Sequence, residues 1–449
     1  MGKFIVKGPT KLKGSVTIAG AKNVALKALV ATLLTNEPVT LRNVPVIGDV
    51  ELMIDVLTSL GKTVRRNDHE VTVTEENGSL TSTVPLEIGA RLRASSIVVG
   101  PLLARTGNVK IPNPGGCRIG ARPIDRHIEG LKSMGTSVEY HPEDGYFWIE
   151  ARTLRGGNIS FEKNTHTGTE TIILAACLAE GKTVIHNAAL EVEVDNLMEM
   201  IGLMGGNVKR TADRVIEIVG VPVLHGCDFS IMPDRNEEVT FAIAAVVSKG
   251  SITVMQSQRH LIGAFLTPFR LAGAGIEEID DSTTRYFWKG PIQAVDIETS
   301  PHPGFMTDWQ APWSLLMVEA EGTSIIHETV FESRFHYATE LTKMGAHIEF
   351  FHPVVDHPEK YYNFNWEDHD PDVAQAVRIV GPNALHNAVM TMNDLRAGAT
   401  LLLATIIAQG ESTIFGIDQI DRGYEQIEAR LSTLGADITR LSEDEIERV

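Results

Sequence analysis

The sequence has little of the chemistry that stabilises small secreted proteins. Its 449 residues include three cysteines, Cys117, Cys177 and Cys227, too few and too scattered for a disulfide framework or a zinc site. This cysteine usage is typical of a reducing cytoplasm. The opening residues, MGKFIV, lack the apolar core of a signal peptide, so we expect a cytoplasmic protein rather than a secreted one.

Long apolar runs and excess positive charge are also missing. No apolar stretch reaches membrane-spanning length, so no membrane contact is expected. The formal net charge of -18 does not suit binding to the phosphate backbone of DNA or RNA. Any anionic ligand must therefore be held by a local group of positive charges. A chain that is 43% hydrophobic and 22% charged predicts a globular protein with two or more domains.

Glycines recur in two interleaved series along the chain. The first series ends an apolar, helix-like run and opens a strand: Gly107, Gly181, Gly250, Gly322 and Gly410, with Asn36, Glu37 and Pro38 in the same place near the start. The second series ends a second helix: Gly61, Gly135, Gly205, Gly273, Gly345 and Gly435. Together they define six units of strand, helix, strand, helix and strands, each of about 70 residues.

The first helix of each unit is apolar on nearly every side. These segments are residues 24–34, 94–104, 172–179, 241–247, 313–318 and 401–408. Such helices must be buried all round, whereas the second helices, for example 49–60 and 424–434, are amphipathic and belong nearer the surface. The strands then form sheets that face solvent on one side. This pattern predicts an α/β fold with helices inside and sheets outside.

Six units exceed one core of ordinary size, so we divide them three and three. The predicted first domain is 22–232, and the second is 1–21 together with 233–449. The opening strands, 4–6 and 15–18, precede the first unit. We expect both of them to complete the last unit, which makes the second domain discontinuous.

The loop 114–123 joins Cys117 to three glycines and two arginines between two prolines. Glycines permit a mobile backbone that closely approaches a ligand, while the prolines stiffen the ends, which is the build of a lid. Neighbouring guanidinium groups favour a thiolate and could hold an anion, so Cys117 could serve as nucleophile or proton donor. The alternative is an ordinary surface turn with an incidental cysteine.

Charged residues gather where helices are predicted to begin. Lys22 and Asn23, Arg93, Asp308, and Asp394 with Arg396 precede buried helices, and Arg122, Arg334 and Arg422 precede second helices. Helix N-termini carry unpaired amides and the positive end of the dipole, so a ring of them would form an anion site. The alternative interpretation makes Asp308 and Asp394 helix caps and the arginines solvated surface charges.

Seven segments in order resemble the signature segments of the UDP-N-acetylglucosamine enolpyruvyl transferase family. They are Ala19-Gly20-Ala21-Lys22-Asn23, Leu92-Arg93-Ala94-Ser95, the 114–123 loop, Pro303-Gly304-Phe305-Met306-Thr307-Asp308, Phe331-Glu332-Ser333-Arg334-Phe335, Asp394-Leu395-Arg396-Ala397 and Ile420-Asp421-Arg422-Gly423-Tyr424-Glu425. The resemblance spans the chain and implies two inside-out α/β barrels of three repeats each. It also implies transfer of the enolpyruvyl group of phosphoenolpyruvate to the 3'-hydroxyl of UDP-N-acetylglucosamine with release of phosphate, the first committed step of peptidoglycan synthesis. No metal or organic cofactor is implied.

The resemblance assigns roles residue by residue. It makes Cys117 the proton donor on the lid, alkylated in such enzymes by the epoxide fosfomycin, and Asp308 the base at the sugar hydroxyl. Phosphate would be held by Lys22, Arg122 and Arg422, and the carboxylate of phosphoenolpyruvate by Arg334 and Arg396, so that Cys117, Asp308, Lys22 and Arg396 form the catalytic set. The nucleotide-sugar side would include Asn23, Arg93, Arg122, Pro123, Ile124, Lys163 and Val330.

The sequence departs from the family pattern in several places, among them Gly48, where many members have lysine. Residues 164–168 read Asn-Thr-His-Thr-Gly, which makes nucleotide contacts there uncertain beyond Lys163. Glu238-Val239 replaces a Thr-Gly pair, and we expect it to alter the interdomain hinge. Residues 352–371 form an insertion rich in histidine, acids and aromatics. Metal binding there is conceivable, but its Pro-broken spacing offers no helical ligand pair and favours a solvated loop.

Two other functions stay open. The sister enzyme that acts on shikimate 3-phosphate shares the implied fold, but its Asp-Lys-Ser and Gly-Asn-Ala-Gly-Thr segments are absent and a thiol-bearing lid is present instead. A catalytically silent paralogue that binds UDP-sugars is the non-enzymatic alternative. Loss of Cys117, Asp308 or Arg396 would indicate such a paralogue, and all three residues are present.

Overall fold

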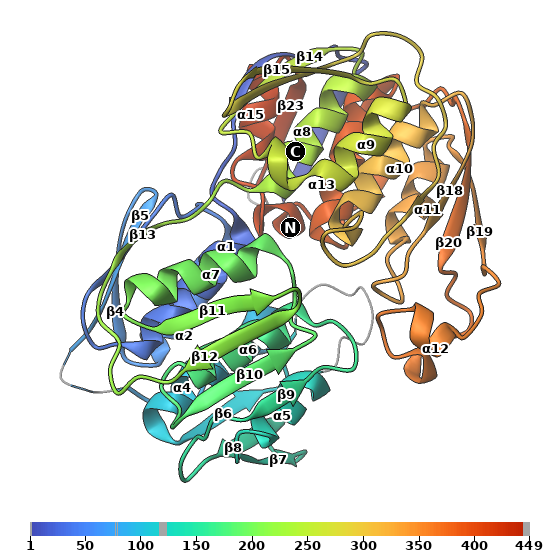
Figure 1. Ribbon diagram of the computed structural model, residues 1–449. Helices are drawn as coiled ribbons and strands as arrows, with labels where there is room; N and C mark the ends of the chain where they lie inside the picture. The colour runs from blue at the N-terminus through green and yellow to red at the C-terminus, as the bar shows by residue number, and fades with distance from the viewer. Residues whose placement is uncertain (1, 77, 79, 116–123, 443–449) are drawn as a thin grey trace. The chain divides into compact units, whose positions relative to one another are not determined.

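The computed structural model describes residues 2–76, 78, 80–115 and 124–442 (Figure 1). These residues form two compact units. The middle unit comprises the described residues of 20–232, and the terminal unit comprises residues 2–19 and 233–442. No described helix has both the length and the apolar character needed to span a membrane.

The middle unit contains the first three repeats. Its helices are α1 (Lys22–Ala31), α2 (Gly48–Ser59), α3 (Leu86–Gly89), α4 (Val99–Thr106), α5 (Asp125–Lys132), α6 (His166–Ala176) and α7 (Val192–Leu203), with 3-10 helices η1 (Thr32–Leu34) and η2 (Arg93–Val98). Its strands are β3 (Val39–Arg42), β4 (Lys62–Asn67), β5 (Glu70–Glu75), β6 (Asn108–Pro112), β7 (Ser137–His141), β8 (Tyr146–Glu150), β9 (Asn158–Ser160), β10 (Lys182–His186), β11 (Asn207–Ala212), β12 (Val215–Val219) and β13 (Asp228–Ser230).

The terminal unit contains the other three repeats. Its helices are α8 (Arg235–Val247), α9 (Gly263–Leu271), α10 (Gln310–Val318), α11 (His336–Lys343), α12 (Pro358–Tyr361), α13 (Leu395–Ile407), α14 (Asp418–Asp421) and α15 (Ile427–Thr433), with η3 (Arg259–Leu261), η4 (Thr307–Trp309) and η5 (Trp366–Asp368). Its strands are β1 (Lys3–Gly8), β2 (Lys13–Thr17), β14 (Ser251–Met255), β15 (Gly275–Asp280), β16 (Thr283–Phe287), β17 (Ile297–Glu298), β18 (Gly322–His327), β19 (His347–Phe351), β20 (Ala376–Gly381), β21 (Val389–Thr391), β22 (Gly410–Phe415) and β23 (Asp437–Leu441).

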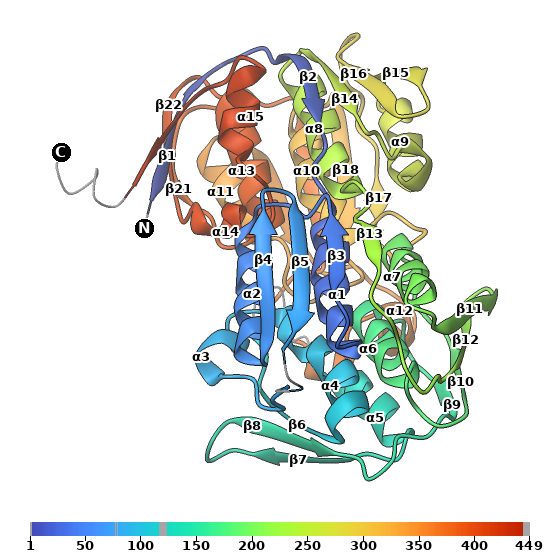
Figure 2. The same cartoon turned by 90° about the vertical axis from the view of Figure 1, so that its left-hand side faces the viewer.

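The first helix of each repeat lies inside its unit, as its apolar sequence predicts. All residues of α8 and α10 are buried, and α8, α10 and α13 pack on one another within the terminal unit, with sheets outside them (Figure 1). Figure 2 shows the sheet of β3, β5 and β4 covering α1 of the middle unit. Gly100 permits the close approach of α4 to α6, because a Cβ there would lie 2.6 Å from the Thr171 carbonyl oxygen. The predicted α/β fold, with buried helices and outward sheets, is confirmed.

The second glycine series ends the outer helices. All six members have left-handed backbone angles, with φ from 89° at Gly135 to 109° at Gly435. A residue of this conformation just after a helix lets the last carbonyl groups find partners, and glycine adopts it without steric cost. The recurring glycine of the sequence therefore marks the same turn in every repeat.

The repeats share one sheet topology. A short edge strand runs parallel to a longer strand, which is followed by two antiparallel strands. The sheet orders are β13-β3-β5-β4, β9-β10-β12-β11, β2-β14-β16-β15, β17-β18-β20-β19 and β21-β22-β1-β23. The sheet of the second repeat, β6-β8-β7, is the exception. Among the described residues it has a single parallel bridge between Thr83 and Lys110 in place of the edge strand.

The two opening strands do not both complete the last repeat. Strand β1 pairs with β22 and β23 of the sixth repeat as expected, but β2 pairs with β14 of the fourth. The reason is an exchange: β13, which precedes the buried helix of the fourth repeat, pairs instead with β3 of the first. The segment that follows β2 and the segment that follows β13 form backbone hydrogen bonds with each other, from Ala21 N to Met232 O (2.7 Å) and from Asp234 N to Ala19 O (2.8 Å).

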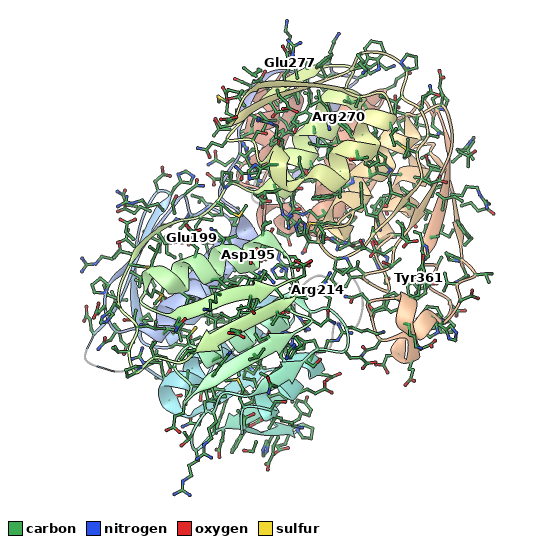
Figure 3. All side chains as sticks on the ribbon, viewed as in Figure 1. Asp195, Glu199, Arg214, Arg270, Glu277 and Tyr361 are labelled. Carbon is green, nitrogen blue, oxygen red and sulfur yellow. The ribbon has the colours of Figure 1, made fainter. Side chains whose placement is uncertain are left out.

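The inserted segment is packed rather than solvated over its second half. Residues 352–375 join β19 to β20, where the equivalent turns are residues 68–69, 142–145, 213–214 and 281–282. Tyr362 is 1% exposed, and its ring stacks on Trp366 with centroids 4.7 Å apart. Tyr361 projects from α12 (Figure 3). The solvated-loop interpretation is therefore wrong for this half, because stacked aromatic rings bury large apolar surfaces. No cluster of metal-ligating side chains occurs among the described residues.

Candidate functional site

Lys22 begins α1, the buried helix of the first repeat. Its Nζ atom lies 2.6 Å from Oδ2 of Asp49, a buried carboxylate in the first turn of α2. Asn23 follows it in the same turn of α1 and is partly exposed. The pair places an ammonium group at the N-terminus of a buried helix, where the helix dipole also favours anions.

The lid residues Cys117, Arg122 and Pro123 lie outside the described residues, so their predicted roles stay predictions. The residues that flank them are described. Before the lid, the Pro114 carbonyl oxygen lies 3.5 Å from Nη1 of Arg93, the first residue of η2. After the lid, the buried Ile124 immediately precedes α5.

The altered 164–168 segment is fixed by α5. Arg126 donates to the Asn164 carbonyl oxygen (3.3 Å), and His127 Nε2 lies 2.9 Å from Thr167 Oγ1. Burial lowers the pKa of His127 to about 3, and the nearby charges of Arg93 and Arg126 act in the same direction. His127 is therefore neutral near pH 7. Lys163 precedes the segment and is partly exposed.

A buried charge cluster beside this segment was missed in the sequence. Glu170 of α6 is fully buried, with Oε1 3.0 Å from His166 Nε2 and Oε2 3.3 Å from Lys27 Nζ. Burial and Lys27 oppose protonation of His166, but Glu170 and Glu191 raise its pKa above the ordinary value. Lys27, the one charged residue in the apolar segment 24–34, was the available signal, because a buried lysine needs a partner.

In the terminal unit, the structure brings Asp308 together with Arg334 and Arg396. Arg334 Nη2 lies 2.6 Å from Asp308 Oδ1, and Arg396 Nε lies 3.9 Å from Asp308 Oδ2. Both guanidinium groups are buried, whereas the Asp308 side chain is 21% exposed. Burial opposes the charge of Arg334, but Asp308, Asp394 and Glu328 raise its pKa above the ordinary value.

The two aspartates predicted as caps behave differently. Asp394 is the N-cap of α13 and accepts from the backbone N–H groups of Arg396 (3.2 Å) and Ala397 (3.4 Å). Asp308 lies inside η4, and its carboxylate pairs with Arg334. The capping interpretation is therefore confirmed for Asp394 and wrong for Asp308.

Arg396 has an available hydrogen-bonding group. Its guanidinium lies over the Tyr424 ring, 5.1 Å from the centroid, and its buried Nη1 atom has no hydrogen-bond partner among the described residues. Burial opposes its charge, but Tyr424, Asp308 and Asp234 raise the pKa of Arg396. A permanently charged donor that is buried without a partner is suited to an anionic ligand. Arg422 is the residue that follows α14, and its Nη1 atom lies 3.4 Å from Gln419 Oε1.

The Glu238-Val239 substitution acts inside the terminal unit. The buried Glu238 carboxylate of α8 accepts hydrogen bonds from the Ser257 hydroxyl, the Tyr286 hydroxyl and the Gln258 backbone N–H. Burial raises the pKa of Glu238. The carboxylate thus ties α8 to the segment that follows β14.

Solved structures establish the class of fold. The enolpyruvyl transferase NikO from Streptomyces tendae aligns with a TM-score of 0.84 at 21% identity, over 98% of this chain and 99% of that chain. An EPSP synthase from Acinetobacter baumannii aligns with a TM-score of 0.72 at 17% identity, over 98% of this chain and all of that one. At these identities the likeness concerns the fold alone, which is that of the enolpyruvyl transferases.

Sequence comparisons establish the family. Residues 6–431 match the family described as EPSP synthase (3-phosphoshikimate 1-carboxyvinyltransferase). Relatives named UDP-N-acetylglucosamine 1-carboxyvinyltransferase are 42% identical in Magnetococcus marinus and 39% identical in Desulfatibacillum aliphaticivorans, each over 98% of this chain and the full length of the relative. The chain belongs to this enolpyruvyl (1-carboxyvinyl) transferase family.

Proposed function

We propose that this chain transfers the enolpyruvyl group of phosphoenolpyruvate to the 3'-hydroxyl of UDP-N-acetylglucosamine and releases phosphate, in the cytoplasm, as a step of peptidoglycan synthesis. The observation that carries the proposal is the full-length identity of 42% with a relative named for this reaction. A second relative named for the same reaction, from Desulfatibacillum aliphaticivorans, is 39% identical over 98% of this chain, which favours the UDP-sugar over shikimate 3-phosphate as acceptor.

The proposed reaction has two stages. A proton is added to the methylene carbon of phosphoenolpyruvate while the sugar oxygen, losing its proton to a base, bonds to the adjacent carbon. This gives a tetrahedral ketal. The bond from that carbon to the phosphate oxygen then breaks, and a proton leaves the new methyl group. The carbon–carbon double bond is thereby restored in the enolpyruvyl group, which is now bonded to the sugar oxygen.

The terminal unit supplies the base in this proposal. Asp308 takes the sugar hydroxyl proton. Arg334, which the family resemblance assigns to the carboxylate of phosphoenolpyruvate, is here proposed to hold Asp308 through the 2.6 Å contact instead. The carboxylate of phosphoenolpyruvate is then assigned to Arg396, whose Nη1 is buried without a partner among the described residues. Arg422 is assigned to phosphate and Val330 to the sugar side.

The middle unit supplies the remaining groups. Lys22 and Arg122 are assigned to phosphate and Cys117 to proton donation. The nucleotide-sugar contacts are assigned to Asn23, Arg93, Arg122, Pro123, Ile124 and Lys163. We also propose that the two units are the domains predicted from the repeats, with the lid at residues 114–123.

The test is phosphate release by the purified protein with phosphoenolpyruvate and UDP-N-acetylglucosamine. We expect turnover with this acceptor and none with shikimate 3-phosphate. Turnover with shikimate 3-phosphate alone would assign the sister activity. Calorimetric binding of UDP-N-acetylglucosamine without phosphate release would identify a silent paralogue instead.

A further inference from the structure

Glu328 is a buried carboxylate that contacts Thr307, the residue before the proposed base. It follows the last residue of β18 and is 1% exposed. Its Oε1 atom accepts from two consecutive backbone N–H groups, those of Val330 (2.8 Å) and Phe331 (3.1 Å). One carboxylate oxygen therefore fixes the turn that leads to the sugar-side residue Val330.

The other oxygen of Glu328 reaches the turn that carries Asp308. Oε2 accepts from Thr307 Oγ1 (2.7 Å) and from Gln310 Nε2 (3.1 Å). The Thr307 hydroxyl in turn accepts from Arg334 Nη1 (3.1 Å), whose Nη2 holds Asp308. A single side chain thus connects the base, the guanidinium that holds it and the Val330 turn.

The connection continues into the core. Gln310 Oε1 accepts from the Tyr337 hydroxyl (2.5 Å), which also lies 2.6 Å from Ser314 Oγ. Gln310, Ser314 and Tyr337 are buried on α10 and α11. The side-chain polar atoms of Glu328, Gln310, Ser314 and Tyr337 all have hydrogen-bond partners inside a closely packed interior, which favours one arrangement of this network. It can therefore transmit the rigidity of the core to the site.

We propose that Glu328 is a positioning residue for the transfer reaction. It touches no substrate, and its negative charge and four acceptor contacts hold Thr307, Arg334 and the Val330 turn so that Asp308 faces the sugar hydroxyl in one orientation. This inference rests on the proposed function. It also predicts a behaviour that a purely structural carboxylate would not show, because the effect on turnover must pass through Asp308.

The kinetic test compares Glu328→Gln with Glu238→Gln. Glutamine keeps the shape, but its NH2 group cannot accept from donors. We expect Glu328→Gln to lower kcat by about 10- to 100-fold, since a misplaced catalytic group costs on this order. Glu238 is the matched control, because it is a buried carboxylate of the same unit whose three donors, Ser257, Tyr286 and Gln258, lie outside the site. Its variant should keep kcat within about threefold.

A double-mutant cycle separates positioning from general damage. If Glu328 acts through Asp308, adding Glu328→Gln to Asp308→Asn should lower kcat by less than about threefold further, because effects within one unit are not additive. A second comparison uses two variants of Thr307. Thr307→Ser keeps the bridging hydroxyl and should retain a higher kcat than Thr307→Val, which lacks it. A full multiplicative loss in the double variant would overturn the inference, as would equal losses in the Glu328 and Glu238 variants.

Hydrogen exchange provides a readout that does not depend on activity. In the ligand-free protein, Glu328→Gln should accelerate exchange of the Val330 and Phe331 amides by about tenfold or more, because both lose a charged acceptor. Glu238→Gln should leave them unchanged. A parent protein that releases no phosphate would contradict the proposed function alone. Unchanged exchange at Val330 and Phe331 would overturn the role of Glu328 whatever the activity.

Discussion

The buried Arg334 and the partly exposed Asp308 form an ion pair, with Nη2 of the arginine 2.6 Å from Oδ1 of the aspartate. Arg334 also donates to the Thr307 hydroxyl, so its planar fork is committed to the turn that carries the proposed base. An oriented carboxylate beside a fixed cation is preorganised for accepting a proton in one direction. The expected behaviour of variants at both residues follows from this geometry.

Asp308→Asn should lower turnover by roughly 10² to 10⁴ while substrate binding survives, because the amide keeps the shape but cannot act as a general base. The measurement is steady-state phosphate release at saturating substrates. Asp296→Asn is a suitable control, since that carboxylate accepts from the Ile325 backbone N–H (2.7 Å) outside the site. Turnover of Asp308→Asn within a few-fold of the parent would remove the base role.

Arg334→Lys tests whether Arg334 holds the Asp308 carboxylate or binds the carboxylate of phosphoenolpyruvate. A lysine ammonium cannot contact Asp308 and Thr307 with the same fork, so we expect kcat to fall by about tenfold or more with a small change in the KM for phosphoenolpyruvate. The opposite pattern, a raised KM with kcat preserved, would return Arg334 to the substrate carboxylate. Steady-state kinetics with phosphoenolpyruvate varied distinguish the two.

Replacement of Cys117 separates proton donation from alkylation. Cys117→Asp should keep measurable turnover, because a carboxylic acid can donate a proton, and should escape irreversible inactivation by fosfomycin, because a carboxylate is a weaker nucleophile than a thiolate. Cys117→Ser should be less active, since a hydroxyl is a poor acid near neutral pH. The measurement is activity across pH with and without preincubation in the epoxide. Equal activity of the serine variant and the parent would show that the thiol is not the donor.

His127 should make the protein sensitive to acid. Its pKa is lowered by burial to about 3, below the ordinary value near 6.5, so the unfolded chain binds a proton that the folded chain does not. The stability it contributes is complete above about pH 6.5 and is lost as pH falls toward 3. His127→Gln should therefore reduce the difference in unfolding free energy between pH 7 and pH 4.5, measured with denaturant.

His141 provides the control for that measurement. Its pKa is raised by the hydrogen bond to Glu143, so His141→Gln should not reduce the loss of stability in acid. The same pH dependence in His127→Gln and the parent would contradict the assignment.

Tyr362 should anchor the inserted segment. Tyr362→Phe removes the hydroxyl that lies 3.0 Å from His327 Nε2 and should lower the free energy of unfolding by about 1 kcal/mol. Tyr362→Ala also removes the stacked ring and should cost about 3 to 5 kcal/mol. Val354→Ala, at a fully exposed position of the same segment, should change stability by less than about 0.5 kcal/mol. A Tyr362→Ala effect as small as that of Val354→Ala would show that the segment is not packed.

The buried helices could be predicted because a helix that is apolar on every side is stable in water only inside a core. The turn glycines could be predicted because one backbone conformation recurs at each. Pairing of the short strands could not. Strands β2 and β13 are a few residues long, and their sequences favour an extended backbone without specifying which sheet edge they join. The exchange between them depends on partners far away in the chain.

The residue types of the site could be predicted from the sequence, but the contacts between them could not. Asp308, Arg334 and Arg396 were visible at the starts of helices, but only folding shows that one arginine is committed to the aspartate while the other keeps a buried nitrogen atom without a partner among the described residues. Glu328 was not predicted, because a single acid after a strand resembles any surface carboxylate in the sequence. Its importance comes from the donors that converge on it from both sides of the site.

The exchange of β2 and β13 sets an order on biosynthesis. The ribosome makes β1 and β2 before the middle unit, yet their partners β14, β22 and β23 emerge only after the whole middle unit has been made. The sheets of the middle unit, by contrast, are complete in sequence once β13 has appeared. Domains generally fold as units during synthesis, so the middle unit can acquire its structure while β1 and β2 are still unpaired, before their partners in the terminal unit have been made.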